Sequence, residues 1–223
     1  MNPRLRVELE RLRERLLGLM EVVTEQLDRA VRVVESGNRA EAESVVLGDR
    51  HVDRLEVELE EECLKVLALH QPVAGDLRFV VAVLKIDGDL ERIGDLAANI
   101  AQRAGKLAVS RPVPFLREYR AMARGARRMV DRAIGAFAGL DADLARRVLA
   151  ADDEVDGLNR VMFRRAREEL RAHPDRVDEL LSALSLFRYL ERIADHATNI
   201  AEDVLYLLEG EVVRHRPPAA AGK

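Results

Sequence analysis

LERIGDLAANIA, residues Leu90 to Ala101, occurs a second time as LERIADHATNIA, residues Leu190 to Ala201, with nine of the twelve positions identical. A second pair of similar segments precedes each copy: VVLGDRHVDRL (Val45 to Leu55) and VLAADDEVDGL (Val148 to Leu158). An internal repeat is a strong guide to architecture, because each copy must form the same structural unit. The chain is therefore predicted to contain one unit of about 100 residues, present twice.

Apolar residues recur at steps of three and four in both copies, which is the spacing of one face of an α-helix. Pro72 and the pair His173–Pro174 interrupt this pattern at corresponding places, and Asp141 is the expected N-cap of the fifth helix. The predicted helices span about residues 5–35, 39–69, 75–106, 115–138, 141–172 and 174–209.

The predicted fold class is all-α, with two tandem pseudo-symmetric three-helix bundles made of six long antiparallel helices. We expect the first bundle at residues 1–106, a linker at 107–114, the second bundle at 115–210 and a disordered tail at 211–223. Short connections imply antiparallel neighbours within each bundle. We expect the two bundles to be joined end to end.

Composition narrows the possible partners and compartment. The net charge of −4 gives no basic excess for binding nucleic acid. Only four of the 36 basic residues are Lys, which fits either phosphate recognition by Arg or a codon bias of the genome. Cys63, the only cysteine, lies in an apolar-periodic run and is predicted to be a core residue. The sequence shows no signal peptide and no apolar run of membrane-spanning length, so we expect a cytoplasmic protein without direct membrane insertion.

Both pairs of repeated segments carry acidic residues four positions apart. On a helix, such residues lie one above the other on the same face, and like charges there are mutually destabilising unless something neutralises them. The acids are Asp49, Asp53, Glu91 and Asp95 in the first copy, and Asp152, Asp156, Glu191 and Asp195 in the second.

The positions of these acids predict that they face one another across two helices. Residues at equal height on antiparallel helices are equidistant from the turn that joins them. Asp49 and Asp95, like the other pair of the first copy, are centred on Pro72. The pairs of the second copy are centred between His173 and Pro174. Each bundle should therefore hold four carboxylates at one level.

Four neighbouring carboxylates favour a metal site, because a bound cation relieves their repulsion. An all-oxygen ligand set suits hard ions such as Mg²⁺ or Mn²⁺, iron clusters are also compatible, and the identity of the metal (Mg, Mn, Fe or Zn) stays open. Asn99 and Asn199, one turn further on, are expected as auxiliary carbonyl ligands.

The alternative is a solvated acidic face with surface ion pairs. Arg92, Arg188 and Arg192 are the basic residues available for it, and Arg92 and Arg192 are also auxiliary candidates that orient the acids or help to hold an anion. Asp87 is predicted to be solvated surface, because Phe187 replaces it in the second copy. His196 is expected to be partly exposed, or to support Asp195 from outside the ligand set.

No motif of an enzyme is apparent. None of the five histidines has a Glu three positions before it, as a di-iron bundle enzyme requires. The sequence also lacks a glycine-rich phosphate loop, a nucleophile elbow and a zinc-protease motif. We therefore predict a protein that is not an enzyme, with no catalytic residues.

The duplicated LER-I-x-D-x-A-x-N-IA motif, each copy preceded by D-x-x-V-D, resembles the PhoU family over nearly the whole chain. The resemblance implies two symmetric three-helix bundles that bind metal ions at E/D-x-x-x-D motifs, here Glu91/Asp95 and Glu191/Asp195. It implies a cytoplasmic negative regulator of phosphate uptake and of the phosphate-starvation response. The family often has His after the Asp of this motif. The second copy keeps it as His196, whereas the first has Leu96, which leaves the equivalence of the two metal sites open.

The partners implied by the resemblance are the ATPase subunit of a phosphate ABC transporter and the sensor histidine kinase of the phosphate two-component system, with a homodimer as the common assembly. Three alternatives remain: a PhoU-like regulator of a low-affinity phosphate carrier, a metal-storage or metalloenzyme bundle, and a plain coiled-coil scaffold. The scaffold would not explain the matched positions of the acids.

Overall fold

The structure is a computed structural model that describes residues 3–107 and 114–210. Within these ranges it contains six long helices and no strand, which confirms the all-α fold. The helices are α1 (Pro3–Ser36), α2 (Arg39–His70), α3 (Ala74–Leu107), α4 (Leu116–Gly139), α5 (Ala142–Ala172) and α6 (Val177–Glu209), with a short 3-10 helix η1 (Pro174–Arg176) before α6. Most of the predicted linker and the whole predicted tail lie outside the described residues.

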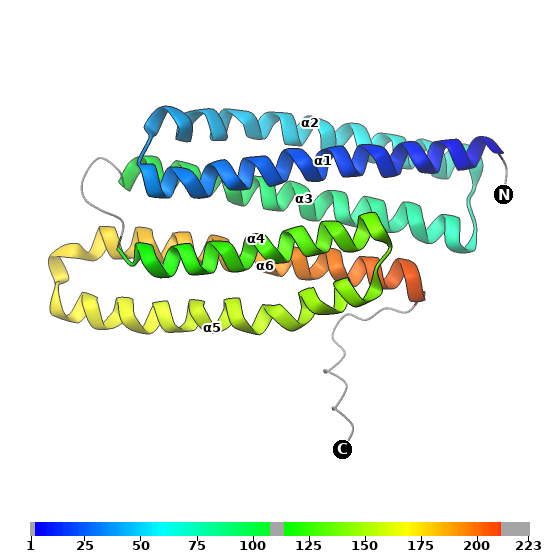
Figure 1. Ribbon diagram of the computed structural model, residues 1–223. Helices are drawn as coiled ribbons and strands as arrows, with labels where there is room; N and C mark the ends of the chain where they lie inside the picture. The colour runs from blue at the N-terminus through cyan, green and yellow to red at the C-terminus, as the bar shows by residue number, and fades with distance from the viewer. Residues whose placement is uncertain (1–2, 108–113, 211–223) are drawn as a thin grey trace, which may run out of the picture.

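The helices form two bundles that lie side by side along their length (Figure 1). α1, α2 and α3 pack against one another, as do α4, α5 and α6, while α3 packs on α6 and α1 on α4. The prediction of an end-to-end junction was therefore wrong. The physical reason lies in the C-terminal half of α3, which is apolar on more than one face and so must be covered from two sides. Its buried residues there are Ile93, Gly94, Leu96, Ala97, Ala98, Ile100 and Ala101.

Side-chain caps fix where two of the helices begin. Asn38 Oδ1 accepts a hydrogen bond from the backbone N–H of Glu41 (3.2 Å) at the start of α2. Asp141 Oδ1 accepts one from the N–H of Leu144 (2.9 Å) at the start of α5, which confirms the predicted N-cap. Each cap satisfies a backbone donor that has no partner within its own helix.

The hydrophobic core runs through both bundles without interruption. Tyr119 of α4 and Phe187 of α6 meet edge to face inside the second bundle, with ring centroids 6.2 Å apart. Cys63 is fully buried, as its place in an apolar run predicts. None of the helices in the described ranges carries an apolar stretch that would allow it to cross a membrane.

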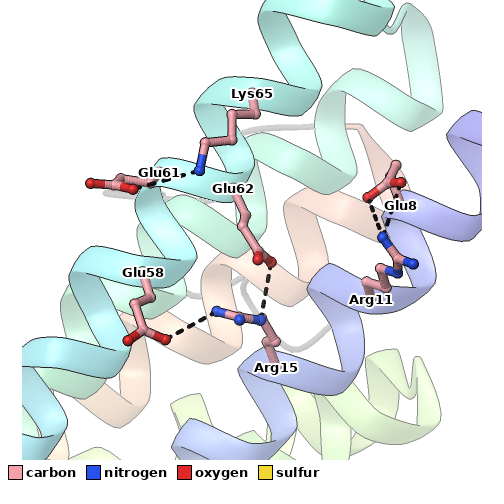
Figure 2. Close-up of polar contacts among 7 residues, drawn as sticks. All are labelled: Glu8, Arg11, Arg15, Glu58, Glu61, Glu62 and Lys65. Carbon is pink, nitrogen blue, oxygen red and sulfur yellow. Dashed lines mark hydrogen bonds and ion pairs between the residues drawn. The ribbon is translucent and has the colours of Figure 1, made fainter.

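The outer face of the first bundle carries exposed ion pairs (Figure 2). Arg15 of α1 reaches across to two acids of α2, Glu58 at 3.4 Å and Glu62 at 3.1 Å. Lys65 pairs with Glu61 (3.6 Å) one turn away on α2. Exposed pairs of this kind contribute about 0–1 kcal/mol each, so they keep the acids of this face neutralised without determining the fold.

Candidate metal centres

The four acids of the first bundle lie close enough to interact. Burial raises the pKa of Asp49 above its ordinary value, and the charges of Asp53 and Asp95 raise it further. Burial also raises the pKa of Glu91, with contributions from Asp95 and Asp53. The antiparallel register of α2 and α3 therefore brings together the residues that the sequence places at equal height.

Gln26 of α1 forms a hydrogen bond with one of these acids, and the sequence analysis missed it. Gln26 Nε2 donates a hydrogen bond to Asp49 Oδ1 (2.9 Å) and lies 3.4 Å from the carbonyl oxygen of Gly94. The sequence does mark this position, because Gln26 is a polar residue within the apolar face of the first helix, three positions after Val23. Gly94 itself permits close packing, since a Cβ there would come within 3.1 Å of Val52 Cγ1.

Arg92 partly neutralises the acids of the first bundle. Its guanidinium lies 3.2 Å from Glu91 Oε2 and 3.2 Å from Asp95 Oδ2. This is the orienting role considered from the sequence, and it holds two of the four predicted ligands in ion pairs. A cation at this centre would have to displace or share these contacts.

The second bundle gathers its acids more tightly. Asp156, Glu191 and Asp195 each offer a carboxylate oxygen, and these oxygens lie within 4.8 Å of one another. In the described part of the chain, this is the one group of at least three such ligands that meets this spacing. Arg188 pairs with Glu191 at 2.7 Å, and Arg160 with Asp156 at 3.4 Å.

Burial and mutual repulsion disfavour the ionised forms of these acids. Burial raises the pKa of Asp152, and the charges of Asp156 and Asp195 raise it further. The same causes, burial first and then neighbouring acids, raise the pKa of Glu191 and of Asp195.

Two buried oxygens in this group have no hydrogen-bond partner among the described residues: Asp152 Oδ1 and Glu191 Oε2. An unsatisfied buried acceptor costs about 1–3 kcal/mol. A hard cation would satisfy such oxygens and remove the repulsion, so the residues of the second bundle fit a metal ion.

The auxiliary candidates are placed differently from the acids. Asn99 and Arg192 are exposed, although Arg192 lies near enough to lower the pKa of Asp195 somewhat. Asn199 Nδ2 donates a hydrogen bond to Asp89 Oδ1 of α3 (3.1 Å). His196 Nδ1 also lies 2.8 Å from that oxygen and is largely buried. The role of Asn199 as a carbonyl ligand stays a prediction, since its amide joins the two bundles here.

The prediction that Asp87 lies on the solvated surface was wrong. The residue is buried, with only 1% of its surface exposed. Its counterpart Phe187 is also buried, so this position belongs to the core in both bundles. Burial raises the pKa of Asp87 to about 8, and the charges of Glu56, Glu60 and Glu91 act in the same direction.

The duplicated bundle also matches a known family. The family model described as the PhoU domain matches residues 16–104 and, a second time, residues 119–204. The chain belongs to the PhoU family. Each match covers one three-helix bundle, so the PhoU domain corresponds to the repeated unit that the sequence predicts.

Relatives resemble the chain over nearly its whole length. It is 38% identical over 209 residues to the phosphate-specific transport system accessory protein PhoU homolog of Aquifex aeolicus, covering 94% of this chain and 95% of the relative. It is 32% identical over 212 residues to the phosphate-specific transport system accessory protein PhoU of Escherichia coli (strain K12), covering 93% of this chain and 86% of the relative.

Solved PhoU structures share the arrangement of the helices. The crystal structure of PhoU from Pseudomonas aeruginosa superposes with a TM-score of 0.90 at 36% identity, covering 92% of this chain and 99% of that one. The phosphate transport system regulatory protein PhoU from Streptococcus pneumoniae gives a TM-score of 0.84 at 27% identity, covering 94% and 99%. The side-by-side bundles are therefore the fold of the PhoU family.

Proposed function

We propose that this chain is a negative regulator of phosphate uptake and of the phosphate-starvation response, and that it acts by binding other proteins rather than by catalysis. The observation that carries the proposal is the similarity, over nearly the whole chain, to proteins named as accessory or regulatory components of phosphate transport. The absence of an enzyme motif from the sequence is consistent with a role in binding.

The proposed partners are the ATPase subunit of a phosphate ABC transporter and a sensor histidine kinase, which the chain would connect in the cytoplasm. One surface contacts the transporter when phosphate is plentiful, and another holds the kinase in its non-signalling state. A homodimer is the proposed assembly. The long, continuous core supports this role, because two bundles fixed side by side present partners with a rigid surface.

Metal binding is part of the proposal. The supporting features are the aligned acids in both bundles, the three close carboxylate oxygens of the second bundle and the two buried oxygens without a hydrogen-bond partner. An ion of the Mg²⁺, Mn²⁺, Fe or Zn²⁺ class bound there would supply positive charge that holds two helices at a fixed spacing. The proposed ligands are Asp49, Asp53, Glu91 and Asp95, and Asp152, Asp156, Glu191 and Asp195.

The test is purification of the tagged chain from cells grown with abundant phosphate, after mild crosslinking, with the partners identified by mass spectrometry. Recovery of a phosphate-transporter ATPase or a sensor kinase supports the proposal. Recovery of a low-affinity phosphate carrier instead would favour the alternative regulator. A chain that elutes alone, with stoichiometric redox-active metal and oxidase activity, would refute the proposed adaptor role.

A matched pair of variants then asks whether the acids matter for the partner. One variant changes the acids of the second bundle to amides (Asp152→Asn, Asp156→Asn, Glu191→Gln, Asp195→Asn). The control changes exposed, ion-paired acids of α2 (Glu58→Gln, Glu61→Gln, Glu62→Gln). If metal is needed for the contact, only the first variant loses both bound metal and partner.

A further inference from the structure

The outer face of α4 carries a stripe of positive charge without ion-pair partners. Arg117, Arg124 and Arg128 are all exposed. Their spacing of seven and then four positions places them on one face of the helix, along roughly 16 Å of its length. None of the three side chains forms an ion pair or a hydrogen bond with any residue in the ranges 3–107 and 114–210. We call these three residues the basic stripe.

The acids of α4 do not neutralise the basic stripe. Glu118 pairs with Arg165 of α5. Asp131 pairs with Arg127, which also lies 2.7 Å from Asp28 Oδ1 of α1. Both acids of this helix are therefore engaged with other arginines, and the stripe presents its charge to the surroundings.

The first bundle carries the opposite charge at the equivalent positions. The offset along the chain that aligns Asp49 with Asp152 also aligns α1 with α4, because it places buried residues of α1 on buried residues of α4. With this offset, the basic stripe aligns with Glu14, Glu21 and Glu25 of α1. These glutamates are exposed, and in the described part of the chain they too form no ion pair. We call them the acidic stripe.

The two stripes do not neutralise each other within one chain, although their helices are neighbours. α1 and α4 run in opposite directions and pack together (Figure 1). The ion pairs that bridge these helices join other residues, Arg120 to Glu35 at 3.0 Å and Arg127 to Asp28 at 2.7 Å. Both stripes lie beside these bridges and take no part in them, so their charges remain available to another molecule.

A hollow beside the basic stripe would accept a carboxylate. It has a volume of about 120 Å³, lies between α4 and α5, and is lined by Arg128 and Arg132, with Gly125 and Glu154 also in its wall. The first copy has Val22 at the position of Gly125, so the second copy has the smaller residue here. A carboxylate that entered this hollow would lie near two guanidinium groups, which bind carboxylates through directional hydrogen bonds.

We infer that the basic stripe of one molecule binds the acidic stripe of a second copy of this chain. Because both stripes belong to the same chain, a two-fold symmetric dimer makes the contact twice, once from each α1 to the other α4. Complementary charges of this kind select the partner and its orientation. The inference rests on the homodimer of the proposed function and assigns the surface that forms it, whereas the proposed contacts with a transporter or kinase do not depend on it.

The matched geometry of the stripes favours a second copy over an unrelated acidic protein. The two stripes have the same number of charges and span the same length of helix, so three positive charges face three negative ones in each contact. An unrelated acidic partner would bind the basic stripe alone and would leave the acidic stripe of α1 without a counterpart.

The experiment reverses each stripe in the full chain and measures self-association by sedimentation equilibrium at low ionic strength. The first variant makes both stripes acidic (Arg117→Glu, Arg124→Glu, Arg128→Glu). The second makes both stripes basic (Glu14→Arg, Glu21→Arg, Glu25→Arg). Each variant alone should dimerise with a Kd at least about tenfold higher than wild type, because like charges then face each other. Mixed in equal amounts, the two variants should form a heterodimer, because opposite charges face each other again in both contacts.

A control variant separates the contact from net charge. Reversing three exposed acids of α2 (Glu58→Arg, Glu61→Arg, Glu62→Arg) changes the net charge as much as the second variant does, yet it leaves both stripes intact. This control should dimerise like wild type. Added salt should weaken the wild-type dimer, because exposed charges are screened. Far-UV circular dichroism checks that each variant is folded.

Three results would overturn the inference, and they differ in what else they affect. If wild type dimerises and neither stripe variant changes the Kd, another surface forms the dimer, while the homodimer of the proposed function stands. If both variants dissociate but do not associate when mixed, the stripes do not contact each other. If wild type is a monomer, the inference and the homodimer are both wrong, while the proposed regulatory role is unaffected.

Discussion

Replacing Asp87 by Asn should stabilise the metal-free protein, by an amount that grows with pH. The folded-state pKa of Asp87 is raised to about 8, compared with about 3.9 for Asp in an unfolded chain. The folded state therefore holds this proton more tightly than the unfolded state does. The contribution of Asp87 to stability is fully present below about pH 4 and is lost as pH rises towards 8.

The magnitude follows from that difference. Each pKa unit corresponds to about 1.4 kcal/mol, so wild type loses roughly 4 kcal/mol of stability from this carboxyl between about pH 4 and pH 7. Asn has nearly the same shape and no charge, so Asp87→Asn avoids this loss. In a chain of this size, that corresponds to an increase in Tm of roughly 10 °C near neutral pH.

The assay is denaturant unfolding of both proteins in a strong chelator, at several values between about pH 5 and pH 8. The gap between them should widen with pH, and Glu58→Gln controls for the change in net charge. A gap that stays constant across this range would refute the assigned environment of Asp87.

Three further predictions test other parts of the fold. Burial raises the pKa of the Cys63 thiol to about 12, so iodoacetamide should alkylate it far more slowly in folded than in denatured protein, as followed by mass spectrometry. Tyr119→Phe should be neutral or stabilising by about 1 kcal/mol in denaturant unfolding, because the buried hydroxyl has no hydrogen-bond partner among the described residues. Asp141→Ala and Asn38→Ala should each cost about 0.5–2 kcal/mol in the same assay, because each removes an N-cap; no loss in either would contradict the capping geometry.

The repeat and the helical periodicity were enough to predict the six helices and the level at which the acids meet. The register of α2 and α3 follows from a short turn, and a short turn leaves little freedom in how two antiparallel helices align. This is why Asp49 and Asp95 could be brought together from their numbers alone. The N-cap at Asp141 was predictable for a similar reason, because capping depends on a few consecutive residues.

Contacts between the bundles were harder to predict, because periodicity shows which face of a helix is buried but not what covers it. The apolar residues on more than one face of the C-terminal half of α3 gave a signal that this helix is covered on two sides. The burial of Asp87 was missed because an acid was assumed to be solvated. Its position, one turn before Glu91 and equivalent to an apolar Phe187, indicated an interior location.

The contact between α3 and α6 is where the two copies of the repeat have diverged most informatively. Asp89 Oδ1 of α3 accepts a hydrogen bond from Asn199 Nδ2 of α6 and lies 2.8 Å from His196 Nδ1. The reciprocal set does not exist, because Tyr189 occupies the position of Asp89 in the second copy and Leu96 that of His196. Replacing Asp89 by an apolar residue would leave His196 and Asn199 without this partner, at a cost of about 1–3 kcal/mol for each unsatisfied group.

This asymmetric contact therefore favours one alignment of the two bundles, whereas a purely apolar interface would allow one bundle to slide along the other. It also distinguishes the two candidate centres. In the second bundle, His196, the residue next to Asp195, contacts Asp89 of α3, so the group of acids on α5 and α6 is linked to the other bundle by a polar contact. In the first bundle the equivalent position is the apolar Leu96, which offers no such polar link. The two copies share one set of acids, but only the second couples it directly to the interface between the bundles.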